Sequence, residues 1–278
     1  MADSRLDDVR RLFAKLMFAA SGSSDPRLER VFETIRREAF VGPGPWNMVF
    51  RRRYVQTPSD DPIHLYQNLL IGLDEAKGIN NGEPFLHARW LGTVAIQPGE
   101  LVTHIGAGTG YYSAIMSLLV RPGGWVTAME IDQDLAGRAK QNLKPFDNVS
   151  VLVGDATQMP IPASDVIYVN AGVIRPPVSW LEALNQNGRL IFPWSPAPDT
   201  GLALLVTRHS GHFDVRPLMP VGFIPCLGAS DAGLSFHAPD ASSVWQVKSL
   251  HLRKDREPDA SAIAVCDAVW FSNAAASE

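Results

Sequence analysis

Three glycines at alternate positions mark the stretch of the chain that is best suited to bind a ligand. Gly106, Gly108 and Gly110 lie within Leu101-Val-Thr-His-Ile-Gly-Ala-Gly-Thr-Gly-Tyr-Tyr112, with a hydrophobic run before them and another, at 113–120, after them. This order predicts a strand, a tight loop and a helix, which together form the first βα turn of a doubly wound sheet. Because glycine has no side chain, the backbone of such a loop can approach a ligand closely.

The residues around the loop favour one nucleotide cofactor over another. A dinucleotide-binding loop has its third glycine where this chain has Tyr111. Glu130 ends the next hydrophobic run, roughly 20 residues further on, where a carboxylate can accept hydrogen bonds from ribose hydroxyls. Asp155 follows a third such run, at 149–153, and could accept from an adenine amino group. Each acid alone could instead cap a helix or sit in a solvated turn, but their order fits S-adenosylmethionine (SAM) better than NAD.

Composition and charge limit the remaining classes of function. The chain has 278 residues, 46% of them hydrophobic and 19% charged, which is enough for one α/β core with additions or for two small domains. A net charge of −4 gives no general electrostatic reason to bind nucleic acid, although basic residues cluster at 51–53. No apolar run approaches the roughly 20 residues that span a membrane. Two cysteines and no signal-peptide core lead us to expect a cytoplasmic protein.

The pattern of apolar residues predicts helices before the glycine loop and alternating elements after it. Helical spacing at 3–20 and at about 27–38 predicts a helical N-terminal cap. Helical patterns alternate with strand patterns from 84 to 192, which is typical of a mostly parallel sheet. Two further strand-like pieces, at 244–252 and 262–270, predict a small C-terminal β extension.

We therefore expect three regions in an α/β protein. They are a helical cap and loop region (1–75), a cofactor-binding core (76–226) and a C-terminal extension (227–278). The extension could cover the substrate cleft or form the contact of a homodimer, and the sequence leaves both alternatives open. His209 and His212 lie on a probable strand-turn, where we predict no metal site.

Segments spread over about residues 25–226 resemble the protein-L-isoaspartate O-methyltransferase family, within the class I SAM-dependent methyltransferases. The matching segments are RREAFVGP, PFLHARWL, HIGAGTGYYSA, AMEID, GDA, DVIYVNAG, NGRLIFPW and VGFIPC. The resemblance implies a Rossmann-like class I fold in which the glycines line the methionine part of SAM, Glu130 holds the ribose and Asp155 the adenine. The predicted cofactor residues are Gly106, Ala107, Gly108, Thr109, Gly110, Glu130, Ile131, Asp155, Ala156 and Asn170.

The chain departs from the family pattern at two places. The family carries Thr-Ile-Ser-x-Pro upstream of the glycine loop, whereas here Asn80 replaces the threonine and Gly82 the serine. His104 stands where the family usually has an acidic residue that helps to order the glycine loop. The resemblance also places His87 where some members have a cofactor-contacting histidine, although a histidine of the core would look the same. The predicted catalytic residues are Asn80, Asn81, Glu83 and His87.

Loss of the two hydroxyls changes the expected acceptor more than the expected chemistry. A carboxylate, with a pKa near 4, is ionised at neutral pH and needs no general base to attack a methyl group. An alcohol or amine would need a base, for which Glu83 or His87 are candidates. We expect a SAM-dependent O-methyltransferase that acts on a carboxylate of a protein or peptide. A methyltransferase with a small-molecule acceptor, such as a small carboxylate, and a SAM-binding regulatory module without turnover are the alternatives.

Overall fold

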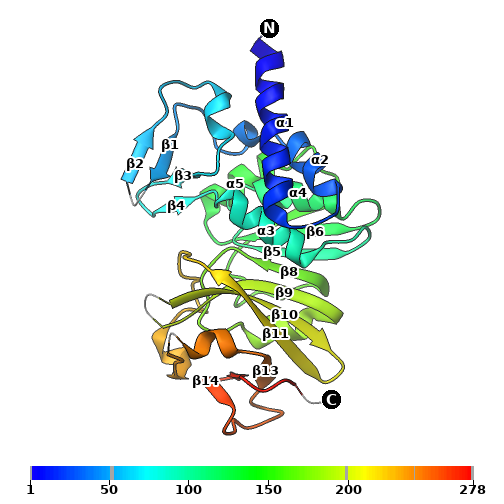
Figure 1. The fold of residues 1–278 in the computed structure, drawn as a ribbon, viewed down its shortest axis with the longest axis vertical. Coiled ribbons are helices and arrows are strands. Elements are labelled where there is room, and N and C mark those ends of the chain that lie inside the picture. Colours follow the sequence, from blue (N-terminus) through cyan, green and yellow to red (C-terminus); the bar gives the residue numbers. More distant parts are fainter. Residues whose placement is uncertain (1, 51–52, 198–199, 241, 277–278) are drawn as a thin grey trace. The chain divides into compact units, whose positions relative to one another are not determined.

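The chain passes between two units at the glycine loop. The computed structural model describes residues 2–50, 53–197, 200–240 and 242–276 (Figure 1). The first unit contains 1–100 and 107–153, and the second contains 101–106 and 154–278. The predicted boundaries after 75 and after 226 both fall inside a unit, so the three predicted regions remain a division by expected function. Of the basic cluster at 51–53, Arg51 and Arg52 lie outside the described residues.

The first unit begins with the two helices predicted from the sequence. Phe13 of the first helix makes edge-on ring contacts with Phe32 of the second, at 6.2 Å between centroids, and with Tyr66, at 5.5 Å. These buried rings fix the helical cap. Elements of this unit are α1 (Ala2–Ser21), α2 (Arg27–Thr34), η1 (Arg37–Ala39), β1 (Asn47–Phe50), β2 (Arg53–Gln56), η2 (Pro62–Leu65), β3 (Leu70–Asp74), β4 (Ile79–Asn80), α3 (Pro84–Val94), α4 (Tyr111–Leu119), β6 (Trp125–Glu130), α5 (Gln133–Asn142) and β7 (Val149–Val153).

A four-stranded antiparallel sheet fills the region 47–83, where the sequence pattern is weakest. Its strand order is β2-β1-β3-β4. Lys77, in the turn between β3 and β4, lies 2.5 Å from the carboxylate of Asp132, which caps α5 through the backbone N–H groups of Asp134 and Leu135. The hydrogen bond from Lys77 holds the pKa of Asp132 below its ordinary value. This ion pair fixes the turn that leads into the Asn80 to Glu83 segment.

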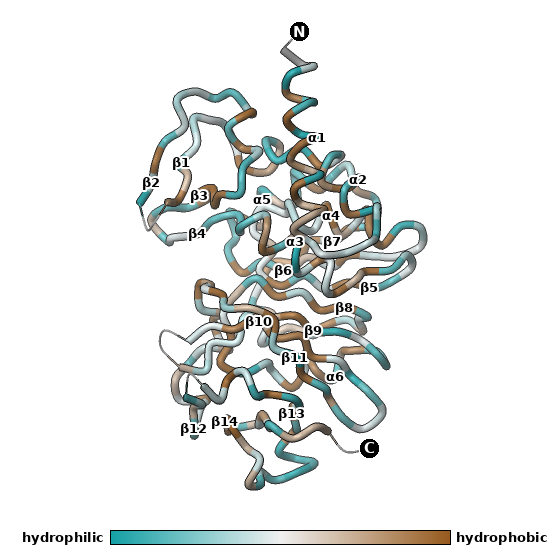
Figure 2. Tube along the Cα trace, viewed as in Figure 1, coloured by the Kyte–Doolittle hydropathy of each residue, from teal (hydrophilic) through white to brown (hydrophobic). Residues whose placement is uncertain are grey.

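The second unit is built on one mixed sheet. Its strand order is β12-β14-β15-β13-β11-β10-β9-β8-β5, and Figure 2 shows hydrophobic residues concentrated on β9 and β10. Its elements are β5 (Leu101–Ile105), β8 (Ser164–Val169), α6 (Val178–Ala183), β9 (Leu184–Ala197), β10 (Thr200–His209), β11 (His212–Pro220), η3 (Ala232–Leu234), β12 (Ser235–His237), η4 (Ser243–Gln246), β13 (Ser249–Leu252), β14 (Ala262–Cys266) and β15 (Val269–Ser272).

Strand pairing changes from parallel to antiparallel at β9, after which no α-helix connects the described strands. β5 pairs with β8 and β8 with β9 in parallel, and in the first unit β6 pairs with β7 in parallel. From β9 outward every described strand pair is antiparallel, and short turns join β9 to β10 and β10 to β11 directly. The α/β class is confirmed, and the described strand pairs within 84–192 are parallel as predicted; the antiparallel strands come from later in the chain. Leu250 of β13 pairs with Phe213 of β11, so the C-terminal extension continues the same sheet.

No helix among the described residues is long and apolar enough to cross a membrane.

Candidate active site

Backbone hydrogen bonds and one carboxylate hold the glycine loop in the first unit. The N–H of Gly108 donates to Oε2 of Glu130 at 2.7 Å, and the N–H of Ala107 donates to the carbonyl of Met129 at 3.1 Å. Nδ2 of Asn142 donates to the carbonyl of Thr109 at 3.0 Å. The loop is therefore ordered by the chain itself, before any ligand binds.

Glu130 combines deep burial with backbone donors. Its side chain also accepts from the N–H of Asp132 at 3.0 Å, and the residue is 6% exposed. Burial raises the pKa of this carboxyl above its ordinary value, against the opposing effect of the backbone donors. A carboxylate has about four lone-pair sites, so Glu130 can hold the loop and still accept from ribose hydroxyls. Ile131, which is also among the predicted cofactor residues, is 44% exposed.

The second unit contains Gly106 and Asn170, at the ends of β5 and β8. Gly106 has a φ of +74°, and a Cβ atom there would lie 3.4 Å from the carbonyl oxygen of Asn170. The backbone N–H of Asn170 donates to the carbonyl of Ile105 at 2.8 Å. Its side-chain Oδ1 is buried and has no hydrogen-bond partner among the described residues. A buried acceptor without a donor is unusual in proteins and fits a ligand that carries an N–H group, such as the ammonium of SAM.

His104 supports Asn170 without carrying a charge. It is fully buried on β5, where its Nε2 lies 2.8 Å from Nδ2 of Asn170 and its ring meets Tyr168 edge-on. Burial lowers the pKa of His104 to about 3, so the ring is neutral and accepts from the amide. The residue that replaces the expected acid therefore orients Asn170, whereas Glu130 orders the loop.

Asp155 is fixed at one oxygen and available at the other. Its Oδ1 accepts from both the N–H and the hydroxyl of Thr157, each at 2.8 Å. Gly228 approaches so closely that a Cβ there would lie 2.3 Å from the Thr157 hydroxyl oxygen. Beside it, the carbonyl of buried Ala156 accepts from the indole of Trp180 at 2.9 Å. Oδ2 of Asp155 is left to accept from a ligand, as the adenine assignment requires.

The segment between β3 and α3 places its three polar side chains differently. Oδ1 of Asn81 accepts from the N–H of Ile71 at 2.9 Å, so this side chain is fastened to β3. Oε1 of Glu83 accepts from Nδ2 of Asn68 at 2.6 Å. Oδ1 of Asn80 accepts from the N–H of Gly82 at 2.9 Å, and its Nδ2 has no partner among the described residues. Nδ2 of Asn81 likewise has no partner among the described residues, but Asn81 is 9% exposed, and Asn80 is the more exposed of the two amides.

His87 fills the space beside Gly82. A Cβ atom at Gly82, where φ is +74°, would lie 2.3 Å from Nε2 of His87. The ring of His87 is 1% exposed and stacks on Tyr112, with 3.8 Å between the ring centroids. The hydroxyl of Tyr112 donates to the carbonyl of Gly82 at 3.4 Å. Tyr112 lies at the start of α4, directly after the glycine loop. This contact therefore packs the Asn80 to Glu83 segment against α4.

A family model described as "Protein-L-isoaspartate(D-aspartate) O-methyltransferase" matches residues 19–231, well over half of the chain. The chain belongs to this family. It is thus a SAM-dependent methyltransferase with the class I fold, as the sequence predicts. A protein-L-isoaspartate O-methyltransferase 2 from Rhodopseudomonas palustris (strain HaA2) is 35% identical over 231 residues, which cover 82% of this chain and 97% of that protein.

Other relatives and solved structures agree. The protein-L-isoaspartate O-methyltransferase of Bradyrhizobium sp. (strain BTAi1) is 29% identical, with 78% of this chain and 93% of that protein covered. A solved protein-L-isoaspartate O-methyltransferase aligns with a TM-score of 0.67 at 26% identity, over 78% of this chain and 66% of that one. A putative one from Plasmodium falciparum, solved with S-adenosyl-L-homocysteine, has a TM-score of 0.63 at 18% identity, over 78% and 97%, and shares the fold.

Within each unit, some residues that contact the predicted site residues were not themselves predicted from the sequence. Of these, only Thr157 could have been identified from the local sequence, because Asp155-x-Thr157 has the spacing of an Asx-type turn. The others act through contacts between segments far apart in the chain, which spacing does not reveal. These additional residues are Tyr112, Asn142, Thr157 and Gly228.

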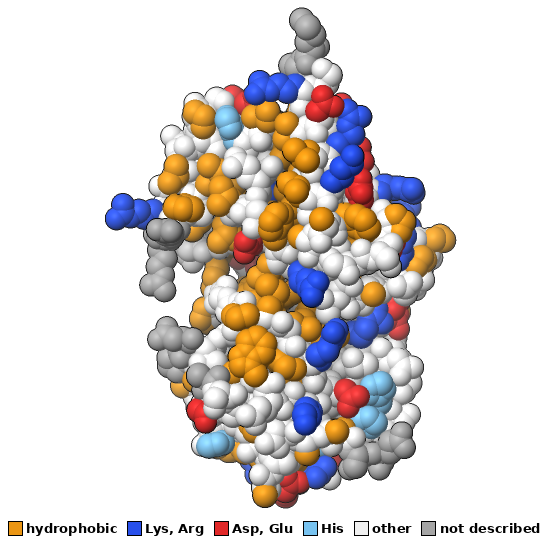
Figure 3. Space-filling view, viewed as in Figure 1, with side chains coloured by type: hydrophobic (Ala, Val, Ile, Leu, Met, Phe, Trp, Pro, Cys, Tyr) orange, Lys and Arg blue, Asp and Glu red, His pale blue; other side chains and the backbone are white. Residues whose placement is uncertain are grey.

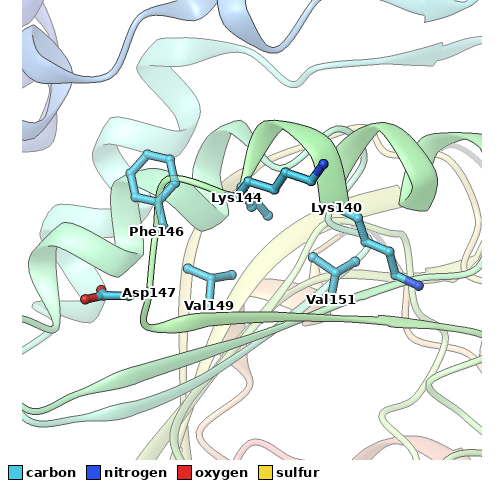
Figure 4. A pocket seen from close by; sticks show the side chains of 7 residues that line it. Lys140, Lys144, Phe146, Asp147, Val149 and Val151 are labelled. Atoms are coloured by element: carbon cyan, nitrogen blue, oxygen red, sulfur yellow. The ribbon is translucent and has the colours of Figure 1, made fainter.

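A pocket of about 350 Å³ lies elsewhere in the first unit, between α5 and β7 (Figure 4). Lys140 comes from α5, Lys144 follows the end of that helix, and two valines come from the edge strand β7. None of the predicted cofactor or catalytic residues lines it, so it is separate from the predicted site. Its lining residues are Lys140, Leu143, Lys144, Phe146, Asp147, Val149 and Val151.

Proposed function

We propose that this methyltransferase esterifies a carboxylate on a protein or peptide, with isoaspartyl residues as the first candidate acceptor. The observation that carries the proposal is the state of the two candidate bases. His87 is buried and stacked on Tyr112, and Glu83 is hydrogen-bonded to Asn68. His87 is therefore shielded from an acceptor, and one of the two carboxylate oxygens of Glu83 is already engaged. With the imidazole shielded, the arrangement favours an acceptor that needs no base.

The chemistry of a carboxylate acceptor requires mainly alignment. SAM, when bound, supplies a methyl group already activated by its sulfonium charge. A carboxylate is ionised at neutral pH, so the chain has no proton to remove and must hold the acceptor oxygen at attacking distance. Holding two reactants in line can account for about 7–11 kcal/mol of a barrier.

Asn80 is the side chain that we assign to the acceptor. Its Oδ1 is fixed by the N–H of Gly82, which orients the free Nδ2 group. An amide N–H can donate to a carboxylate as a hydroxyl does, so Asn80 would replace the donors that the Thr-Ile-Ser pattern supplies elsewhere in the family. The relatives named protein-L-isoaspartate O-methyltransferase support the isoaspartyl residue as the source of that carboxylate.

The test compares matched acceptors. Purified protein and SAM are incubated with two peptides of one sequence, one with an isoaspartyl residue and one with a normal aspartyl residue, and with a panel of small carboxylic acids. We expect a base-labile methyl ester on the isoaspartyl peptide. Ester on small acids with neither peptide modified would replace the peptide proposal by the small-molecule alternative. Bound SAM with no ester on any acceptor would favour the regulatory alternative.

The remaining expectations stay predictions from the sequence. They concern the cytoplasmic location, the homodimer and the lack of a nucleic-acid or membrane partner.

A further inference from the structure

The hairpin formed by β10 and β11 gathers three potential metal ligands on one face of the second unit's sheet. His209 pairs with His212 across the turn, and Thr207 pairs with Asp214. Alternate residues of a strand point to the same face, and paired residues share a face. His209, His212 and Asp214 therefore project to one side. The sequence-based prediction of no metal at these histidines leaves out this carboxylate, which is two residues beyond His212.

The donor atoms are close together and open to solvent. Nε2 of His209 lies 3.3 Å from Oδ2 of Asp214, and Nε2 of His212 lies 3.9 Å from Oδ1. All three potential donor atoms fall within 4.8 Å of one another. The side chains are 36%, 17% and 52% exposed, in the same order, so an ion could enter from solvent. Figure 3 shows histidine and acidic side chains side by side at the molecular surface.

The 3.3 Å separation matches that around a tetrahedral ion, and the 3.9 Å separation would shorten when an ion binds. Zinc holds imidazole nitrogens and carboxylate oxygens at about 2.0–2.2 Å, which puts neighbouring donor atoms about 3.3 Å apart. Two imidazoles and a carboxylate are also a ligand set that zinc accepts with water as the fourth ligand. His251 on the adjacent strand β13 is hydrogen-bonded with Ser249 and stacked on Trp270, so we do not count it as a ligand.

We propose that His209, His212 and Asp214 bind one Zn²⁺ ion, with water completing its coordination. The ion would stabilise the end of the β10–β11 hairpin by joining the last residue of β10 to the first residues of β11. The site lies at the opposite end of β10 from Thr200 and contains none of the residues assigned to SAM or the acceptor. Its role is therefore structural or regulatory and does not replace a step of methyl transfer.

The test uses the untagged full-length protein after treatment with a chelator. Calorimetric titration with Zn²⁺ should give one ion per chain, and titration with Co²⁺ should give the strong visible absorption of a tetrahedral complex. The variants His209→Gln, His212→Gln and Asp214→Asn should each weaken Zn²⁺ binding by more than about tenfold, because each removes a ligand. Zn²⁺ should also raise the melting temperature of the wild-type protein and not that of the variants.

A matched variant and a fold control make the outcome decisive. His237, exposed on β12, belongs to the same unit but lies outside the cluster, so His237→Gln should bind Zn²⁺ as the wild type does. Far-UV circular dichroism and SAM binding identify variants that have lost their fold. The proposal is overturned if the folded wild type binds no stoichiometric Zn²⁺, or if His209→Gln/His212→Gln binds it unchanged.

Discussion

The ring of His87 occupies the space that a side chain at position 82 would need, and Gly82 leaves that space open. A Cβ atom at position 82 would lie 2.3 Å from Nε2 of His87 and 3.3 Å from Cε2 of Tyr112, which fixes that imidazole by stacking. A serine at 82 and an imidazole at 87 are therefore incompatible at this backbone geometry. A serine at position 82 would therefore require the ring of His87 to move.

Gly82→Ser should consequently fail to restore a family-like site. We expect it to lower the free energy of unfolding in urea by about 1–3 kcal/mol more than Gly78→Ser does. Gly78 is the matched control because its φ is also positive, at +68°, and a Cβ there would meet nothing within 4 Å. The difference between the two variants isolates the clash from the backbone strain. Equal losses in both would mean that His87 moves aside without cost.

His104 gives the folded protein a predictable sensitivity to acid. Its pKa is lowered to about 3 in the folded protein, whereas an exposed histidine in the unfolded chain titrates near pH 6.5. As the pH falls below 6.5, His104 therefore binds a proton in the unfolded chain but stays neutral in the folded protein. Folding stability from this group is complete above pH 6.5 and declines through the window down to about 3.

Between pH 6.5 and pH 5, this single group should reduce the free energy of unfolding by about 2 kcal/mol. The variant His104→Gln, which cannot titrate, should lack that part of the decline. Urea unfolding of both proteins at several pH values measures the difference. Parallel stability curves for the two proteins over this window would show that His104 takes up its proton without unfolding.

At the scale of elements, the connection from β3 to α3 contains two adjacent amide side chains that are held differently. Asn81 is bound to β3 through both its side chain and its backbone, since its N–H also donates to the carbonyl of Ile71 at 3.0 Å. Asn80, one residue earlier, keeps its Nδ2 group free. The adjacent amides are thus held differently: Asn81 stabilises the segment, and Asn80 is the one that we propose to face the acceptor.

Substituting aspartate at each position separates these roles. Asn80→Asp retains the acceptor for the N–H of Gly82 but removes the donor, so kcat/KM for the isoaspartyl peptide should fall about 10–100-fold with stability nearly unchanged. Asn81→Asp adds the same charge one residue away and buries it, so its main effect should be on unfolding. Steady-state kinetics and urea unfolding of both variants test this. A similar fall in kcat/KM for both variants would mean that the added charge causes it, and not the loss of the Asn80 donor.

How far the sequence predicts these elements depends on whether the signal is local. The glycine loop, α3, β6 and the two N-terminal helices follow from periodicity and turn residues, and the structure contains them. The sheet in 47–83 could not be predicted because its strands are short and pair across turns. The same holds for the neutral His104–Asn170 pair and the His87–Tyr112 stack, which join residues 66 and 25 positions apart. Spacing identifies which residues can do chemistry, and tertiary contacts decide which of them are free to do it.

At the scale of the whole molecule, the C-terminal extension is part of the second unit's core. Trp194 of β9 and Phe271 of β15 are both fully buried, with 4.6 Å between their ring centroids. The extension therefore buries strands of the methyltransferase core sheet in addition to lengthening that sheet. Its removal would expose the edge of β11, which pairs with β13.

Phe271→Ala should accordingly lower the free energy of unfolding by about 3–5 kcal/mol, because it leaves a cavity against Trp194. Phe236→Ala is the matched control, since Phe236 is 64% exposed in the same extension and should change stability little. Thermal or urea unfolding compares the two. A small effect of Phe271→Ala would indicate that the extension packs only loosely on the sheet.

The central claim, that this chain transfers the methyl group of SAM to an isoaspartyl carboxylate, is tested most directly by a single-turnover reaction. The enzyme is mixed with one equivalent of SAM carrying a deuterated methyl group and an excess of the isoaspartyl peptide, and tandem mass spectrometry locates the label. We predict the label on the isoaspartyl residue, as an ester that mild base removes, and none on the aspartyl control. Label on another residue or group, or no label although SAM is bound, would contradict the claim.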